Sequence, residues 1–404
     1  MENPVRPLLK RSSNRRSFLK NGAVAAGAAT LAAGLVPVGA AAFDQDNSGP
    51  VTKGDIAILT FLSALEQVEA DLWIQYAELG GLTNAVPGGE GLATNDLAQN
   101  GKPITTGIAT NYVLALQILD TDMPQYITDN TDDEISHHAF LNNFLASKGA
   151  RPIDLSEFAI LPPSQVTGVP QHGRLTNLKQ LTVDTSWWTR YRSSTANPDL
   201  GGTFENAIPD LAKGQHPAIP LNDGDLALNP DGSIPNHLQA IAFTAGFHFG
   251  FIEQGGTSLY PTLAQRVTNV EVLRVLLSIG PTEAMHFQTW HDKAGNFNLI
   301  SDPAQNLSFP NLNAGIDPNT GASGAADEFQ TNLIMPEPTV FLNQNLGPVS
   351  IVRPTADFDG GARAAVKAFK DDGLFVDPAT GKDTGIVARL MELAEAADAA
   401  QRGL

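Results

Sequence analysis

The sequence contains no cysteine among its 404 residues. A chain without cysteine forms no disulfide, performs no thiol chemistry and builds no iron–sulfur cluster or cysteine zinc site. Any metal ion that it binds must therefore be held by carboxylate oxygens and imidazole nitrogens. Histidine is scarce as well, with eight in the whole chain, so a histidine in a recognisable spacing is informative.

Positively charged residues are also few. The chain has 25 Lys and Arg against 43 Asp and Glu, which gives a formal net charge of −18. Nucleic acids and anionic membrane surfaces are bound through basic patches, so we expect neither as a partner. Hydrophobic residues make up 42% and charged residues 17% of the chain, the balance of a globular protein.

No run in the sequence is apolar enough for a convincing membrane span. The one mildly apolar run lies between residues 21 and 42, after a basic segment and before a stretch of alanines. This layout is typical of a cleaved secretory signal, and the string "RRSFLK" at residues 15–20 resembles the twin-arginine export signal. We therefore expect residues 1–42 to direct export to the periplasm or the extracellular space. The alternatives are an ordinary secretory signal and a retained anchor.

Apolar residues at helical spacing mark four long regions in the rest of the chain. A break is expected near Pro124, inside the second region. Two shorter helices are expected at residues 362–370 and 384–402. The four long regions are residues 54–81, 110–147, 237–254 and 269–293.

The longest connection, residues 150–236, separates the second helical region from the third and shows little periodicity. A four-helix bundle with one long crossover has this order, and ferritin-like folds place the crossover there. We therefore predict an all-α core: a ferritin-like four-helix bundle over residues 54–296. The crossover would be an irregular insertion, and residues 297–404 a loop-rich C-terminal extension with short helices.

Two copies of one short motif carry the functional signal. The segment "DDEISHHAF" places Glu134 three residues before His137, and "TEAMHF" places Glu283 three residues before His286. Residues three apart on a helix project from one face, so each pair can reach the same metal ion. One such pair is usually a solvated helix face, but its repetition on the second and fourth helical regions favours a shared site.

The first and third helical regions each supply a further carboxylate. Glu66 and Glu253 lie within apolar runs, where an unpaired charge would be costly. Four carboxylates and two neutral imidazoles balance two divalent cations, and bundles that hold two iron or two manganese ions use this ligand set. Oxygen and nitrogen ligands without thiolate suit either metal.

These residues, in this order, resemble the ferritin-like superfamily, in particular its exported, stress-associated branch related to plant desiccation-related proteins. The resemblance rests on "LEQVEADLW", "DDEISHHAFL" and "TEAMHFQTW" and covers residues 54–149 and 236–295. It implies two divalent metal ions as cofactor, with iron ahead of manganese. The implied ligands are Glu66, Glu134, His137, Glu253, Glu283 and His286.

Two features qualify this ligand set. An aromatic residue seven positions after a ligand, as Trp73 after Glu66, is common in related bundles and favours Glu66 over Glu69. Glu69 lies on the same inner face and stays the alternative. Pro281 precedes Glu283 closely, and a proline inside a helix removes a hydrogen bond and bends it. We expect a bend there that would shift Glu283 relative to His286.

The other polar features have simpler interpretations. His138, His248 and His291 are expected to pack in the core or on the surface, with orientation of a ligand as the alternative for the last two. The acidic segment 222–233 lacks the spacing of a calcium loop, so turn chemistry explains it better. The tryptophans at 187 and 188 are expected to anchor the insertion.

Three functions are compatible with the sequence. The first is an exported oxidoreductase that uses the metal pair with dioxygen or peroxide, including peroxide disproportionation by manganese. The second is a non-catalytic stress or envelope protein, in which the metal is structural or absent and the loops bind a partner. The third is iron storage, which the insertion and the tail disfavour. The substrate and the oligomeric state, a homo-oligomer included, are left open.

Overall fold

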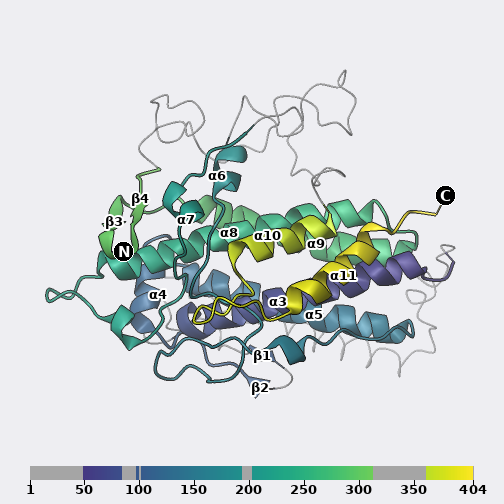
Figure 1. The fold of residues 1–404 in the computed structure, drawn as a ribbon, viewed down its shortest axis with the longest axis horizontal. Helices are drawn as coiled ribbons and strands as arrows, with labels where there is room; N and C mark the ends of the chain where they lie inside the picture. The colour runs from purple at the N-terminus through teal and green to yellow at the C-terminus, as the bar shows by residue number, and fades with distance from the viewer. Residues whose placement is uncertain (1–48, 84–96, 100–101, 193–202, 313–360, 404) are drawn as a thin grey trace, which may run out of the picture.

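The computed structural model describes residues 49–83, 97–99, 102–192, 203–312 and 361–403 (Figure 1). The expected signal, residues 1–42, lies outside the described residues. The described part of the chain is mostly helical, in agreement with the predicted all-α core. No helix in it is both long and apolar enough to cross a membrane.

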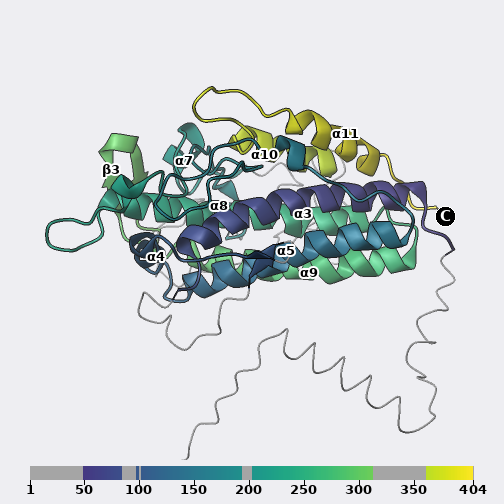
Figure 2. The ribbon, with the colours of Figure 1, turned by 90° about the horizontal axis from the view of Figure 1, so that it is seen from below.

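Four long helices run alongside one another (Figure 2). Helix α3 packs along α5, and α8 packs along α9. A shorter helix, α4 (Thr110–Leu116), packs against α3 and α8. The long helices are α3 (Lys53–Gly80), α5 (Met123–Ser147), α8 (Asn236–Ala264) and α9 (Val270–Lys293).

Helix α3 begins at a capping box. The Thr52 hydroxyl accepts from the Asp55 backbone N–H at 3.1 Å, and the Asp55 carboxylate accepts from the Thr52 N–H at 2.9 Å. This reciprocal pair satisfies two N–H groups that a helix start leaves without a partner. Asp55 also accepts from the Thr268 N–H at 2.8 Å. The start of α3 is thereby tied to the segment that leads into α9.

The break expected near Pro124 is confirmed, and one helix end differs from the sequence prediction. The second region is divided into α4 and α5, and Pro124 lies in the first turn of α5, where its missing N–H removes no helical hydrogen bond. The third helix was expected to end at Gln254, but α8 continues through two glycines and Pro261 to Ala264. The residues after Gln254 stay helical because almost all of them are buried.

The long connection is irregular, as predicted, and side-chain contacts hold it against the long helices. Arg174 forms a buried ion pair with Glu78 of α3 at 2.5 Å. Trp187 contacts the rings of Phe247 and Phe287, on α8 and α9. The expected anchoring role of the tryptophans is therefore confirmed for Trp187. The connection's short helices are η1 (Ser156–Phe158), α6 (Ser186–Arg190), α7 (Pro209–Lys213) and η3 (Asp223–Leu226).

The strands are few and short. Strands β1 (Ala98–Gln99) and β2 (Lys102–Pro103) form one antiparallel pair. Strands β3 (Ile300–Asp302) and β4 (Leu307–Phe309) form another, with Ile300 opposite Phe309. The turn η4 (Pro303–Gln305) joins the second pair, which rests on α8.

The C-terminal helices belong to the same hydrophobic core as the long helices. Helix α10 (Ala362–Asp372) and helix α11 (Ile386–Asp398) fall where short helices were expected. Helix α11 packs on α3, and α10 packs on α11 and α8. Val366, Phe369 and Leu390 are buried members of the central cluster. The described end of the chain is therefore packed against the long helices.

Candidate metal centre

The six residues predicted as ligands meet in the interior between the four long helices. Their ligand atoms form two groups, and within each group the atoms lie within 4.8 Å of one another. One group holds Glu66, Glu134, His137 and Glu283, and the other Glu134, Glu253, Glu283 and His286. Glu134 and Glu283 belong to both groups, so the groups are adjacent. Every member is buried except His286, which is half-buried.

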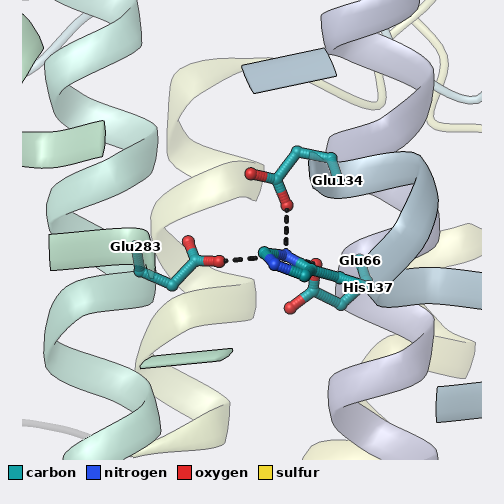
Figure 3. Close-up of side chains that lie close together, drawn as sticks. All are labelled: Glu66, Glu134, His137 and Glu283. Carbon is teal, nitrogen blue, oxygen red and sulfur yellow. Dashed lines mark hydrogen bonds and ion pairs between the residues drawn. The ribbon is translucent and has the colours of Figure 1, made fainter. Parts of the chain in front are cut away.

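In the first group, three carboxylates surround one imidazole nitrogen (Figure 3). His137 Nδ1 lies 3.2 Å from Glu66 Oε2, 3.1 Å from Glu134 Oε2 and 3.4 Å from Glu283 Oε1. One nitrogen carries at most one hydrogen, so it cannot bond well to all three carboxylates at once. The ligand atoms of these four side chains therefore face one common position.

The second group repeats this arrangement. His286 Nδ1 lies 3.2 Å from Glu134 Oε1 and 3.3 Å from Glu253 Oε2. The opposite nitrogen, Nε2, lies 3.2 Å from Asp133 Oδ2. Glu134 therefore presents one oxygen to His137 and the other to His286. A carboxylate in this position can bridge two cations.

The bend expected at Pro281 does not remove Glu283 from the site. Helix α9 is continuous from Val270 to Lys293, and Glu283 reaches both groups. Room for its carboxylate comes from Gly256 on α8, where an added Cβ would lie 2.3 Å from Glu283 Oε2. The close approach of α8 and α9 thus depends on a glycine at this point.

Glu283 also provides the test of whether the site fits a cation. It is 1% exposed, and neither of its oxygens accepts a hydrogen bond within the described structure. The 3.4 Å ion-pair contact with His137 lacks hydrogen-bond geometry. A buried carboxylate without donors is costly, and a cation between the two groups would satisfy it. Buried carboxylates and imidazoles of this kind can hold a metal ion.

Asn130 donates hydrogen bonds to two carboxylates of the second group. Its Nδ2 donates to Glu134 Oε1 at 3.0 Å and to Glu253 Oε1 at 2.9 Å. Its Oδ1 accepts from Trp290 Nε1 at 2.9 Å. Bonds of this kind fix the orientation of ligating carboxylates. Tyr260 has the same role in the first group, where its hydroxyl donates to Glu66 Oε1.

The structure favours Glu66 over Glu69. Glu66 lies in the first group and contacts both His137 and Tyr260. Glu69 is buried nearby but is not a member of either group. Trp73, which pointed to Glu66 by spacing, stacks on Phe249 within the aromatic core.

Burial dominates the electrostatics of the carboxylates. It raises the pKa of Glu66 to about 7 against the opposing effect of His137. It also raises the pKa of Glu253. The pKa values of Glu69 and Glu283 lie well above the ordinary range, because burial and the neighbouring carboxylates act in the same direction. A metal-free cluster therefore retains protons that a cation would displace.

The two histidines and Glu134 shift in the opposite sense. Burial acts to lower the pKa of His137 and His286, but the surrounding carboxylates outweigh it and raise both. Burial acts to raise the pKa of Glu134, but His137 and His286 outweigh it and leave that pKa below its ordinary value. Glu134 is thus the most acidic carboxyl of the cluster, in agreement with its central position.

Three residues beside the cluster were missed by sequence reasoning: Asn130, Asp133 and Gly256. Asn130 lies one helical turn before Glu134, and Gly256 lies three residues after Glu253, so both share a face with a ligand. That spacing was an available signal, but asparagine and glycine are common on helix faces. Asp133 contacts its histidine only because α5 and α9 are adjacent.

The remaining histidines lie outside both groups. His138 bonds to Gln67 at 3.1 Å, His291 bonds to Arg192 at 2.9 Å, and His248 lies in a separate buried cluster. The structural role expected for His138 agrees with its contact. The acidic segment 222–233 is built from turn bonds, such as the Asn222 side chain accepting from the Gly224 N–H at 2.8 Å.

Comparison with family models, curated proteins and solved structures finds no match to this chain.

Proposed function

We propose that this chain is an exported ferritin-like four-helix bundle protein whose carboxylate–histidine cluster holds two divalent metal ions. We further propose that it is an oxidoreductase that acts with dioxygen or peroxide. The observation that carries the proposal is the pair of adjacent buried groups that share Glu134 and Glu283. Each of the four long helices contributes a carboxylate to them, and the long connection lies between the second and third long helices. This order of helices and connection supports a four-helix bundle with one long crossover.

The ligands divide naturally between two ions. Glu66 and His137 would hold one, Glu253 and His286 would hold the other, and the shared carboxylates would lie between them. A metal pair supplies one-electron chemistry toward dioxygen or peroxide when it is bound. Asn130 and Tyr260 keep the carboxylates oriented, and the burial of the cluster excludes bulk water from it.

Iron is proposed ahead of manganese. Carboxylate and imidazole ligands serve both metals, and neither thiolate nor thioether is present in the ligand set. The proposal follows the resemblance in "LEQVEADLW", "DDEISHHAFL" and "TEAMHFQTW". The same resemblance, with the string "RRSFLK", supports export.

One observation favours a second candidate, in which the metal is structural. The four carboxylates are 1% exposed or less, and the His286 side chain, at 11%, is the most exposed of the six. A site this closed can stabilise the fold without admitting a substrate. In that case the protein would be a non-catalytic stress or envelope protein.

Metal analysis of the full chain, produced with iron or with manganese, tests the proposal. We expect about two ions per chain, the number that such ligand sets hold. Glu134→Gln should lose most of both ions because Glu134 contacts both groups. Asp129→Asn, at an exposed position on the same helix, should retain them.

Optical spectra recorded after adding dioxygen or peroxide separate the two candidates. An oxidation band in the loaded protein supports the oxidoreductase, and stoichiometric metal without any redox response supports the structural role. Full metal content in both Glu134→Gln and Glu283→Gln would remove the basis for either.

A further inference from the structure

A second buried polar cluster lies beside the metal centre and is formed by three helices. The Tyr76 hydroxyl on α3 lies 2.8 Å from His248 Nδ1 on α8. His248 Nε2 lies 2.9 Å from Asp372 Oδ2, at the end of α10. The three residues are no more than 2% exposed. None belongs to either metal-binding group.

The hydrogen bonds run in one direction through this cluster. A carboxylate has no hydrogen to donate, so Asp372 pairs with the His248 tautomer that carries its hydrogen on Nε2, and in that neutral tautomer Nδ1 accepts from the Tyr76 hydroxyl. The phenol therefore donates to a base. Tyr112, another buried tyrosine, donates instead to the Ala218 carbonyl at 2.7 Å, and a carbonyl cannot take up a proton at ordinary pH.

The network is not what stability alone would select. Among the described residues, Asp372 Oδ1 and Trp73 Nε1 are buried and find no hydrogen-bond partner, and such groups cost free energy. Burial also raises the pKa of Tyr76 well above its ordinary value. The hydroxyl therefore keeps its proton until something removes an electron from the ring.

Aromatic rings connect Tyr76 with Trp290, and Asn130 connects Trp290 with the carboxylates of the candidate metal centre. The Tyr76 and Trp73 rings are 5.7 Å apart, and Trp73 stacks on Trp290 at 5.4 Å with 22° between the planes. The Phe249 ring contacts all three of these rings. Trp290 then donates to Asn130, whose amide bonds to two of the carboxylates.

We propose that Tyr76 is a redox-active tyrosine, that His248 receives its proton, and that Trp73 and Trp290 carry its electron toward the metal centre. The Tyr76 O–H bond breaks and a His248 Nδ1–H bond forms. The electron reduces an oxidised Trp73 ring, which leaves a neutral tyrosyl radical and an imidazolium facing Asp372. The oxidant, by class, is an oxidised metal ion at the cluster, and this identity rests on the proposed function.

A photochemical experiment tests the tyrosine independently of that function. The chain has no cysteine, so Gln288→Cys at an exposed site on α9 accepts one ruthenium photosensitiser near Trp290. The full chain is supplied with zinc, which is redox-inert. Flash-quench oxidation produces ruthenium(III), and electron paramagnetic resonance then detects the radical. We expect a tyrosyl signal that disappears in Tyr76→Phe and persists in Tyr112→Phe.

The proton acceptor is tested in the same labelled chain. His248→Phe should lower the radical yield by about tenfold or more, since a positioned base contributes at least that much to proton transfer. In deuterated solvent, the radical of the labelled chain with no further substitution should show an exchangeable hydrogen bond from His248. This second measurement requires no substitution at Tyr76 or His248.

The outcomes separate the two proposals. A signal retained in Tyr76→Phe, or one lost only in Tyr126→Phe, would overturn the assignment of Tyr76, because Tyr126 also contacts Trp290. A Tyr76 radical in the photochemical experiment, together with no metal uptake by the chain, would support the tyrosine and reject the metal centre as its oxidant.

Discussion

Within the metal centre, the Glu283 side chain lies against the backbone of α8 at Gly256, where a methyl group would meet the carboxylate at 2.3 Å. One position before it, at Gly255, a methyl group would have no neighbour within 4 Å. Both glycines are inside the same helix. They differ in what a side chain would contact, and this makes them a matched pair.

We expect Gly256→Ala to weaken metal binding and Gly255→Ala to leave it unchanged. The added methyl displaces Glu283 from the position that both groups share, at a cost of about 1–3 kcal/mol for overpacking. That cost corresponds to at least about a fivefold loss of affinity. Competition with a chelator measures it.

Thermal or urea unfolding provides the control for this pair. Alanine in a helix interior stabilises by about 0.5–1 kcal/mol relative to glycine, so Gly255→Ala should be slightly more stable than the unsubstituted chain. Equal metal affinities in the two variants would show that Glu283 does not contribute to binding.

Glu134, His137, Glu283 and His286 were predictable because the three-residue spacing depends only on helix geometry. Glu66 and Glu253 were predictable because a carboxylate within an apolar run needs a partner. Asp133 was not, since its contact with His286 joins residues 153 positions apart. The Asn130 bond to Glu253 spans 123 positions. Such contacts depend on how the helices face one another, and local spacing carries no information about that.

At the scale of elements, the helix interiors were easier to predict than the helix ends. The apolar stripe of α3 identified it almost to the residue. The third helix was predicted too short because Gly255, Gly256 and Pro261 are stop signals when they are considered locally. In the folded chain Gly256 is packed against Glu283 of α9, and most of the residues between Gly256 and Ala264 are buried, so tertiary packing outweighs the local preference.

His237 ties the first turn of α8 to two other elements. Its Nδ1 lies 2.7 Å from Asp302 of β3, and its Nε2 lies 3.4 Å from Asp225 of η3. These carboxylates, Asp225 foremost, outweigh burial and raise the pKa of His237 to about 9. The protonated imidazole therefore stabilises this end of the helix.

We expect the free energy of unfolding to fall as the pH rises through about 9. The pKa of His237 is higher in the folded chain than its ordinary value of 6.5, so the stabilisation is fully present below pH 6.5 and is lost as the pH rises through about 9. The side chain is 34% exposed. Solvent screening should keep the effect below about 1 kcal/mol.

Urea unfolding between pH 6 and pH 10 measures this effect against two variants. His237→Gln should remove this component of the pH dependence. His172→Gln should not, because His172 is exposed and its pKa is lowered, so it is neutral throughout the upper part of this range. An unchanged profile in His237→Gln would show that the contact with the two carboxylates does not stabilise the fold.

At the scale of the whole molecule, the cluster links the stability of the folded chain to pH. Burial raises the pKa of Glu66 to about 7 from its ordinary value of 4.5. A carboxyl with a raised pKa destabilises the metal-free fold as the pH rises through this window. Divalent cations compensate the charge and so remove the penalty.

We expect loading with iron or manganese at pH 7 to raise the melting temperature and to release protons. A ligand at a hundred times its dissociation constant stabilises by about 2.7 kcal/mol. Affinity should fall with decreasing pH, because the ions compete with protons for the carboxylates. Calorimetry in buffers of different ionisation enthalpy counts the protons.

Glu134→Gln gives the contrast for this prediction, since it should show neither the rise in melting temperature nor the proton release. If metal binds to the unsubstituted chain without releasing protons, the carboxyls are already ionised in the metal-free protein. That result would contradict the raised pKa values.

The overall architecture was only partly accessible from the sequence. The order of helices and the irregular long connection followed from periodicity and its absence. The packing of α10 and α11 onto the long helices did not, because a short amphipathic helix indicates which face is apolar but not what covers it. The same limit concealed Asp372, whose partner His248 lies 124 residues earlier.

The position of Asp372 has a consequence for the order in which the protein can be completed on the ribosome. Synthesis proceeds from the N-terminus, so α3 and α8 emerge long before the helix that supplies the carboxylate for His248 and the helix that covers α3. Until then a nascent chain holds a histidine in its interior without that partner and an uncovered apolar face. The contacts of His248 with Asp372 and of α3 with α11 can therefore form only after these last helices have left the exit tunnel.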